Sequence, residues 1–551
     1  MKSAELRQER SDHCDGRVIA VQPSTSRCLN QNVAIARFLA IFRTTRSGQD
    51  IVKSTPRCGS PRDVRCLSSV RSKRFLVSGL AVLLIGCIDR ALDSSRPAVT
   101  LDNVVPAANP YNALSSIISF AATGMDSARV LYWPPGGPQE ATPFYRIQNG
   151  VGRIAALGLR PNTAYSFVVE ADGGDASIHS TPVQLTTGFL PNFLQSVHLN
   201  VTGAPTPGYV LTSLSQGDTV AFAIAFDQSG NVVWYREFDY GVRAVETKQQ
   251  ANGDFSLFVG SSLGSDATYG WYVEFKPDGQ LVRTYAANPP YYTDSHELLL
   301  TFRDSVLQNA LLFGYDLRRV DLTPVGGPAN ALVGGHSLLR QTPSGGVDFF
   351  WSAWDHFVLE DWIEPPDFLK QLTQVDFDHP NSLDIDHDGN YLVSWRSFGE
   401  VTNIDSRNGN IIWRLGGRNN QFTFVNDPLG GFSAQHSVRE LDNGDLLMYD
   451  NGWRHNPPES RAAVYRLDLN AKTATLVWEF RHSPPIFTGF AGSVQRLVNG
   501  NTLIGWGFAA TVTEAGIDGT ALWEGQLNSG GQPAIFYRCT KISSLYEFRR
   551  P

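Results

Sequence analysis

The sequence predicts an all-β fold, a six-bladed β-propeller preceded by a small β-sandwich of the immunoglobulin or fibronectin III type. Residues 377–479 repeat one four-strand pattern twice, and each copy opens at a histidine, His379 or His436, and ends at a tryptophan. Asn-Gly and Asp-Gly turns separate the alternating apolar runs, which is a strong hairpin signal. The spacing from His379 to His436, and from His436 to Ser493, is 57 residues. Four antiparallel strands at a fixed period describe a propeller blade.

The copies upstream of residue 377 are looser but follow the same plan. Residues 220–238 contain the end of a first blade, residues 247–285 a second, and residues 295–351 a third that carries an insertion. Ser493 opens a last copy that closes near Trp523. The expected total is about six blades across 192–551.

The residues before the propeller fall into three predicted segments. Residues 1–70 are basic and irregular and hold four of the six cysteines, so we expect a non-native or disordered leader. In 71–87 a charged start is followed by the apolar run Phe75–Gly86, which is too short to span a bilayer unaided. Residues 97–190 alternate at period two, with Tyr165 in the region of a tyrosine corner, and predict the fibronectin III-like sandwich.

The segment 71–87 is typical of a secretory signal peptide. It also resembles a bacterial lipoprotein signal, in which a small residue precedes the cysteine that is lipidated; here that cysteine is Cys87. We therefore expect a periplasmic or envelope-anchored bacterial protein. A cleaved signal without lipid and a simple anchor helix are the alternatives. Beyond Cys87 the sequence contains only Cys539, so no internal disulfide is expected there.

Charge and composition exclude one class of partner. The formal net charge is −7, charged residues make up 18% of the chain, and no basic stripe occurs in the main body. Nucleic-acid binders carry clustered positive charge. We therefore expect no nucleic-acid partner.

Three histidines occupy equivalent repeat positions and form the predicted site. The first strand of each propeller blade lines the central channel, so residues that open these strands converge at one mouth. His296, His379 and His436 open three such strands. His336 is an alternative to His296 if the phase of the blades differs, whereas other histidines, such as His387 and His455, are expected in solvated loops.

Two further residues accompany His379. Asn381 follows it on the same face of the strand, and Arg396 comes just after the partner strand of that hairpin. Imidazole, amide and guanidinium groups together suit an oxyanion with several oxygens. A neutral histidine can also act as a nucleophile toward sulfur or phosphorus.

At these residues the sequence resembles the bacterial arylsulfate sulfotransferase (ASST) family, most strongly in HPNSLDIDHDGNYLVSWR and QHSVRELDNGDLLMYDNG. The resemblance implies transfer of a sulfuryl group from a phenolic sulfate ester to a phenolic acceptor without a nucleotide donor. It implies that His436 becomes sulfated in a ping-pong mechanism and that Asn381 binds the substrate. His379, Arg396 and His296 are then the remaining catalytic residues. No cofactor or metal is implied, and homodimers occur among relatives.

Two other functions are compatible with the same residues. The three histidines could bind a metal ion for an oxygenase or hydrolase, although Arg396 beside a metal is unfavourable unless an anionic substrate bridges them. A non-catalytic surface-binding propeller would use the channel mouth for a sugar or peptide. The natural phenols, and whether water competes as acceptor, are not determined by the sequence.

Overall fold

The computed structural model describes residues 99–546, except 175–176, 218–219, 240–242, 263–267 and 364–373. The predicted leader 1–70 and the signal segment 71–87 with Cys87 lie outside the described residues. Regular structure within the described residues consists of strands and short 3₁₀ helices, so the all-β prediction is confirmed. Among these residues no helix is long and apolar enough to cross a membrane.

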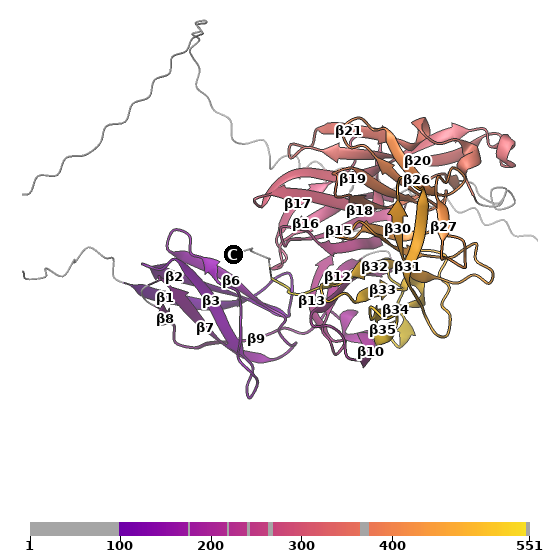
Figure 1. The fold of residues 1–551 in the computed structure, drawn as a ribbon. Coiled ribbons are helices and arrows are strands. Elements are labelled where there is room, and N and C mark those ends of the chain that lie inside the picture. The colour runs from indigo at the N-terminus through magenta and orange to yellow at the C-terminus, as the bar shows by residue number, and fades with distance from the viewer. Residues whose placement is uncertain are drawn as a thin grey trace, which may run out of the picture. The chain divides into compact units, whose positions relative to one another are not determined.

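The strands between residues 100 and 186 form two antiparallel sheets, which Figure 1 shows in indigo and purple. One sheet contains β1 (Thr100–Ala108), β2 (Ser115–Thr123) and β6 (Val151–Leu157). The other contains β4 (Glu140–Ala141), β3 (Ser127–Trp133), β7 (Ala164–Asp172) and β8 (Ser177–His179), with β5 (Tyr145–Arg146) on β3 and β9 (Val183–Thr186) on β7. Alternate residues of both sheets, such as Phe120, Val130 and Phe167, pack into one core.

The Tyr165 hydroxyl accepts a hydrogen bond from the backbone N–H of Arg160, five residues upstream, at 3.1 Å. This is the contact of a tyrosine corner. It agrees with the fibronectin-like pattern of this segment, and the boundaries 97–190 and 192–551 stay predictions.

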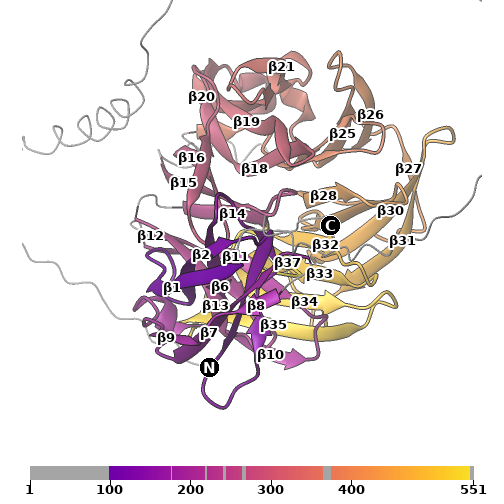
Figure 2. The ribbon, with the colours of Figure 1, turned by 90° about the vertical axis from the view of Figure 1, so that its left-hand side faces the viewer.

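Six further sheets follow along the chain, and we number them in order (Figures 1 and 2). Their strands have these bounds. Sheet 1 contains β11 (Tyr209–Gln216), β12 (Val220–Phe226), β13 (Val232–Phe238) and β37 (Cys539–Ile542). Sheet 2 contains β14 (Arg243–Gln249), β15 (Phe255–Ser262), β16 (Thr268–Phe275) and β17 (Leu281–Tyr285). Sheet 3 contains β18 (Tyr292–Arg303), β19 (Val306–Val320), β20 (Ala331–Gln341), β21 (Val347–Ser352) and β22 (Gln374–Asp376).

Neighbouring strands of the remaining three sheets are antiparallel, except for one short parallel strand at the edge of sheet 5. Sheet 4 contains β23 (Pro380–Ile385), β24 (Tyr391–Trp395), β25 (Glu400–Ile404) and β26 (Ile411–Gly416). Sheet 5 contains β28 (His436–Glu440), β29 (Leu446–Asp450), β30 (Arg461–Asp468), β31 (Thr473–Arg481) and β27 (Thr423–Val425). Sheet 6 contains β32 (Ser493–Arg496), β33 (Thr502–Gly505), β34 (Thr511–Ala515), β35 (Ala521–Ser529), β36 (Gln532–Pro533) and β10 (Val197–Gly203).

Two strands join the beginning of this region to its end. β10 pairs with β35, so an early strand becomes the outer strand of sheet 6. β37 pairs with β11, so a late strand becomes the first strand of sheet 1. One edge strand of each of the six sheets contacts its counterpart in the next sheet, and these contacts form a ring from β37 through β14, β18, β23, β28 and β32 back to β37. We call these six strands the first strands of their sheets.

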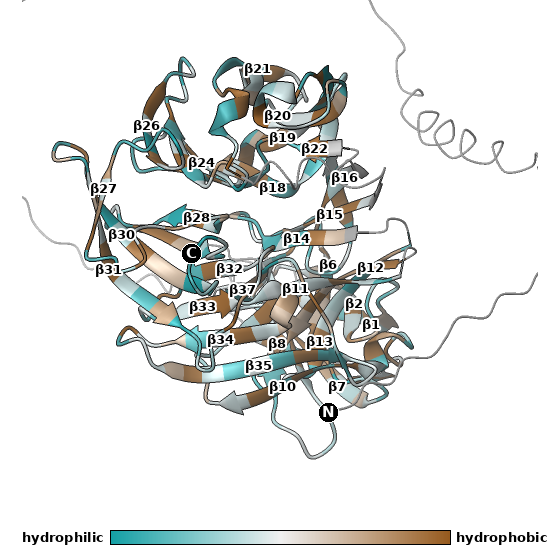
Figure 3. Ribbon diagram, turned by 90° about the vertical axis from the view of Figure 1, so that its right-hand side faces the viewer, coloured by the Kyte–Doolittle hydropathy of each residue, from teal (hydrophilic) through white to brown (hydrophobic). Residues whose placement is uncertain are grey.

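Apolar side chains between neighbouring sheets supply the packing, and the distribution of apolar residues can be followed in Figure 3. Trp234 of sheet 1 stacks on Phe255 of sheet 2 with ring centroids 4.7 Å apart. Leu199 of β10 is 1% exposed and belongs to the core between sheets 6 and 1. Burial of such side chains drives the association of the sheets.

Leu199→Ala tests how much the pairing of β10 contributes to stability. Removing a fully buried leucine leaves a cavity, and we expect the free energy of unfolding to fall by about 2–5 kcal/mol. Chemical denaturation followed by tryptophan fluorescence measures it. Val306→Ala is the matched control, because Val306 is 62% exposed, and should change stability by less than about 0.5 kcal/mol. Equal losses in both variants would contradict a core role for Leu199.

Candidate functional site

A cavity of about 420 Å³ is lined by residues from around the ring of first strands. It contains all three predicted histidines, His296, His379 and His436. The rings of His296 and His379 have centroids 4.7 Å apart, and those of His379 and His436 6.4 Å. The other lining residues are Ser213, Ser215, Ala244, Val245, Asp294, Ser295, Tyr315, Asp376, Phe490, Ala491, Phe508, Ile535, Phe536 and Tyr537.

His436 opens β28 and is 1% exposed. Its Nδ1 lies 2.7 Å from Asn451 Oδ1 and 3.1 Å from the Ala434 carbonyl oxygen. Both partners are acceptors, because the Asn451 amide nitrogen donates to the carbonyls of Thr488 and Ala491 at 2.7 and 3.0 Å. The network therefore assigns the proton to Nδ1 and leaves a lone pair on Nε2.

The electrostatic surroundings keep the His436 ring neutral. Burial lowers its pKa well below the ordinary value, and the positive charges of His379 and Arg396 lower it further. A neutral imidazole with a lone pair on Nε2 is the form that can attack an electrophile.

His379 lies just before β23, and its Nδ1 is 2.5 Å from Asp376 Oδ2. Burial lowers the pKa of His379 more than the Asp376 carboxylate raises it, and His296 and Arg396 lower it as well. The Asp376 contact fixes the ring so that Nδ1 faces the carboxylate. Nε2 is therefore the nitrogen available for a ligand.

His296 lies on β18, and its Nδ1 is 2.9 and 3.0 Å from the two oxygens of Asp294. Its ring also packs edge-on against Tyr537, with centroids 5.6 Å apart. Burial raises the pKa of Asp294, but His296 and His336 outweigh burial and hold that pKa well below the ordinary value. His296 thus stands beside an ionised carboxylate.

The structure places His296, and not His336, with the other two histidines. His336 is on β20, the third strand of sheet 3, and is 1% exposed. Its ring contacts Asp378 through Nδ1 and lies 3.3 Å from Asp294 through Nε2. It does not line the cavity. Position therefore favours His296 over His336, and its catalytic role stays a prediction.

The strands distort where they present these side chains. The register of β18, β23 and β28 shifts at Thr293/Leu298, Pro380/Ser382 and His436/Arg439. β-Bulges of this kind redirect side chains next to functional sites. His379, Ala434 and Ser437 have φ values of 49°, 53° and 55°, a strained region for residues other than glycine. Such strain is concentrated at functional sites.

Arg396 follows β24, and its backbone N–H donates to the His379 carbonyl at 2.9 Å. Its guanidinium stacks on Phe490 at 4.5 Å and on Trp453 at 5.6 Å from the ring centroids. Arg396 does not line the cavity itself, but Phe490 does. Its charge lowers the pKa of both His379 and His436, so it acts electrostatically on the site.

Asn381, which is predicted to bind the substrate, lies beside the cavity and not in its lining. Asn381 is 0% exposed and does not line the cavity. Its side-chain amide donates to the Gln435 backbone carbonyl at 2.6 Å, and the backbone carbonyl of Asn381 accepts from the Arg538 guanidinium at 2.9 Å. The register shift at Pro380/Ser382 breaks the simple alternation on which the prediction depended. Asn381 thus links two adjacent first strands beside the cavity.

Sequence reasoning missed the partners of the histidines. Asp294 and Asp376 lie two and three residues before His296 and His379, and this spacing was the available signal. Asn451 comes from the end of β29 and Tyr537 from the segment before β37, so no repeat position marked either residue. Tyr537 packs near both His296 and His436.

One of the two predictions of solvated histidines is wrong. His387 is exposed in its turn, with 71% of the side chain accessible. His455 is buried, because Nδ1 approaches the Glu459 carbonyl at 3.1 Å and Nε2 lies 3.3 Å from Asp450. The loop carrying His455 therefore folds back onto sheet 5.

Among the described residues, one group has ligand atoms close enough to hold a metal ion: His336, Asp376 and Asp378, whose atoms lie within 4.8 Å of one another. Two ligand atoms on one ion stand roughly 3 Å apart, given metal–ligand distances near 2.1 Å. His336 Nδ1 and Asp378 are closer than that, at a short hydrogen-bond separation. The group fits a shared proton better than a metal.

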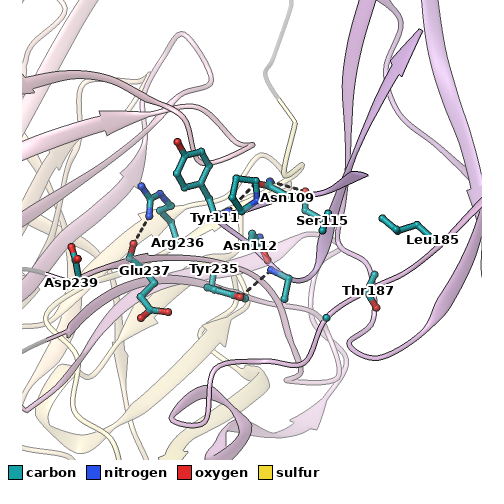
Figure 4. Close-up of a pocket in the computed structure, with 14 residues that line it drawn as sticks. Asn109, Tyr111, Asn112, Ser115, Leu185, Thr187, Tyr235, Arg236, Glu237 and Asp239 are labelled. Atoms are coloured by element: carbon teal, nitrogen blue, oxygen red, sulfur yellow. Dashed lines mark hydrogen bonds between the residues drawn. The ribbon is translucent and has the colours of Figure 1, made fainter. Parts of the chain in front are cut away.

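A second cavity, of about 510 Å³, contains none of the predicted site residues. Figure 4 shows its lining, where Arg236 donates to the Glu237 carbonyl and the Tyr235 hydroxyl accepts from the Ala113 N–H at 2.9 Å. The Arg236 guanidinium stacks over Tyr111 at 4.5 Å. These polar groups satisfy one another, and the histidine cavity remains the candidate site.

Comparison with known proteins gives one family match. The model of the family described as Arylsulfotransferase (ASST) matches residues 265–528, which include all the histidines of the cavity and Arg396. No curated protein matches the chain.

Solved structures resemble the chain only distantly. A Bacteroides caccae protein of unknown function is 15% identical, with 62% of this chain and 100% of that chain covered and a TM-score of 0.39. A catalytically inactive virginiamycin B lyase from Staphylococcus aureus with quinupristin is 8% identical, with 60% and 88% covered and a TM-score of 0.29. A Bacteroides thetaiotaomicron protein of unknown function is 13% identical, with 79% and 99% covered and a TM-score of 0.25. At these TM-scores no conclusion is drawn from the likeness.

Asn451→Asp should raise the pKa of His436. The variant places a carboxylate where a neutral amide now accepts the Nδ1 proton, and a negative neighbour favours the charged ring. Ring ¹⁵N chemical shifts followed with pH measure the change. In the unchanged protein the His436 ring should titrate below the ordinary histidine pKa of about 6.5. A His436 ring that titrates at or above that value in the unchanged protein would contradict the assigned environment.

Proposed function

Because residues 265–528 of this chain belong to the arylsulfotransferase (ASST) family, we propose that it moves a sulfuryl group from a phenolic sulfate ester to a phenolic acceptor. We propose a ping-pong reaction with a sulfated His436 intermediate and no nucleotide donor. The observation that carries the proposal is the state of His436, whose proton is held on Nδ1 by Asn451 and Ala434 while Nε2 remains a nucleophile.

In the first half-reaction the Nε2 lone pair of His436 attacks sulfur and the sulfur–oxygen bond to the aryl group breaks. The Nδ1 proton stays on the ring, so the sulfated ring carries a positive charge beside the anionic sulfuryl group. A histidine, His379 or His296, gives a proton to the leaving phenolate. The bound sulfate ester is itself an anion and favours protonation of these rings.

In the second half-reaction an acceptor phenol returns its proton to that histidine and its oxygen attacks sulfur. The sulfur–nitrogen bond breaks, and His436 returns to its neutral form. Splitting one displacement into two is the advantage of a covalent intermediate.

We propose that Arg396 stabilises the negative sulfuryl oxygens in both steps. Its guanidinium is held by stacking on Phe490 and Trp453, which reduces the reorganisation needed when charge moves. Asn381 supports the site indirectly in the unliganded arrangement, because its amide is committed to Gln435. A direct contact between Asn381 and the substrate would require that hydrogen bond to break.

Apolar residues at the cavity suit the aryl ring of both substrates. Phe490, Phe508 and Ile535 line the cavity and are also exposed to solvent. Aromatic rings bind other rings through offset or edge-on packing. The apolar side of the cavity and its histidine side thus match the two ends of a phenyl sulfate.

We also propose the finer fold and location that this function needs. The six sheets are then the blades of one propeller, with β10 and β37 closing the ring. The segment before β10 is a fibronectin-like sandwich that resembles an assembly or supporting module. Secretion through 71–87, lipid attachment at Cys87, an envelope location and a homodimer complete the proposal.

His436→Asn should abolish sulfuryl transfer and leave the fold intact. An amide of similar size cannot form the sulfated intermediate. The measurement is release of 4-nitrophenol from 4-nitrophenyl sulfate by purified full-length protein, with and without added phenol and after treatment with a chelator. Release by the unchanged protein should rise strongly with phenol and survive chelation.

Each other outcome identifies a different function. Release independent of phenol would indicate a sulfatase, and release lost on chelation would indicate a metal enzyme. His387→Asn is the control, since His387 is exposed, and it should keep full activity. Substantial activity in His436→Asn would overturn the role of His436.

Arg396→Lys should lower kcat/KM by about 100-fold, the usual scale for loss of one group that stabilises developing negative charge. Lysine keeps the charge but loses the planar group that stacks on Phe490 and Trp453. Arg407→Lys is the matched control, because the Arg407 side chain is 81% exposed. A loss confined to KM would instead indicate that Arg396 binds the ground state and the transition state equally.

A further inference from the structure

His336 lies outside the cavity yet contacts the carboxylates that hold the cavity histidines. It comes from the third strand of sheet 3, whereas the cavity histidines come from first strands or the residue before one. Its ring is buried at 1% exposure and packs edge-on against Tyr315, with centroids 4.5 Å apart. A buried histidine with an acidic group on each side is the feature that the proposed mechanism leaves unused.

Both ring nitrogens of His336 face a carboxylate. Nδ1 makes a short contact with Asp378 Oδ1, and Nε2 lies 3.3 Å from Asp294 Oδ2. Asp378 also accepts the backbone N–H of His336 at 2.7 Å. A neutral ring can donate from one nitrogen only, and its other lone pair would then face a negative oxygen.

Each of these carboxylates is also tied to a cavity histidine. Asp294 accepts from His296 Nδ1 with both oxygens. Asp378 accepts the backbone N–H of His379 at 2.8 Å, and this contact fixes the residue whose φ is 49°. His336 therefore connects the supports of two histidines that come from neighbouring sheets.

We infer that His336 is a positioning residue: a buried imidazolium, shared between Asp294 and Asp378, that keeps His296 and His379 in place with Nε2 toward the cavity. The kinetic part of this inference rests on the proposed sulfuryl transfer. Its structural part, the doubly protonated ring, does not.

Charge balance explains why the cation is needed. The acidic groups that face His336 are Asp378, Asp294 and, at longer range, Asp376, while Tyr315 packs on its ring and His296 shares Asp294 with it. Burial lowers the pKa of His336, but Asp378 and Asp294 outweigh it and raise that pKa well above the ordinary value. Two buried carboxylates without the cation would favour uptake of a proton by one of them. A protonated Asp294 would then be a poorer acceptor for His296 Nδ1.

The first test needs no variant. Ring ¹⁵N spectra of the full-length protein, labelled at its 11 histidines, should contain one ring that stays doubly protonated at pH values well above the ordinary histidine pKa of about 6.5. If no ring remains doubly protonated there, the inference is overturned, whether or not the protein transfers sulfuryl groups. Elemental analysis should find no stoichiometric metal ion; a metal ion lost in His336→Gln would also overturn it.

The second test compares His336→Gln with the control His387→Gln in the same assay. Glutamine can donate to Asp294 but carries no charge. We expect kcat to fall roughly 10- to 100-fold, as for other residues that support a site histidine, with little change in KM. The acid limb of the pH profile should move to higher pH, because the carboxylates then take up a proton more readily. His387→Gln should leave both unchanged.

The ring spectra and the kinetic comparison distinguish failure of the His336 inference from failure of the proposed function. An unchanged pH profile and kcat in a folded His336→Gln would overturn the positioning role. Should that variant fail to fold, Asp378→Asn removes the other partner of His336 and should shift the doubly protonated ring to a lower pKa; an unshifted ring would overturn the bridge. Absence of any transfer by the unchanged protein would reject the proposed function and leave the spectra to decide on the bridge.

Discussion

The candidate site depends on one interaction made three times: a protein oxygen holds Nδ1 of each cavity histidine. The oxygens belong to Asp294 for His296, Asp376 for His379, and Asn451 with Ala434 for His436. Because Nδ1 is occupied, Nε2 is the reactive nitrogen in all three rings. The partner is a carboxylate for His296 and His379 and an amide for His436, and this difference gives the rings different chemical roles. Burial lowers the pKa of His379 and the Asp376 carboxylate opposes this shift, whereas Asn451 is uncharged and His436 stays neutral, with its proton on Nδ1 and a nucleophilic Nε2.

The backbone strain that this arrangement requires is located at the ring of first strands. Bulges and left-handed residues at His379, Ala434 and Ser437 aim the side chains, and each such residue costs of order 1–3 kcal/mol. The surrounding sheets pack large aromatic residues such as Trp395 and Trp506 with no exposure. A rigid scaffold around a distorted rim is a general solution for placing reactive groups.

The sequence was sufficient for the repeating part of this molecule and insufficient where the repeat is broken. The 57-residue period located His379 and His436, because equivalent positions of repeated hairpins carry equivalent side chains. The position of Asn381 outside the cavity was not predicted, because a register shift interrupts the strand alternation at that point. Asn451 and Tyr537 lie 15 and 101 residues after His436, and the burial of His455 depends on how its loop folds against Asp450 and Glu459. Local pattern contains no information about such contacts.

The late position of β37 in the chain has a consequence for biosynthesis. Residues 539–542 supply the first strand of sheet 1, and Tyr537 of the cavity comes just before them. A ribosome must therefore release these residues before either the first sheet or the cavity can be complete. Sheets 2 to 5 can form from sequential hairpins during synthesis, but sheet 1 must wait for its partner strand. The cavity is thus complete only after translation has passed its last residue, so a partly made chain lacks part of the candidate site until its fold is closed.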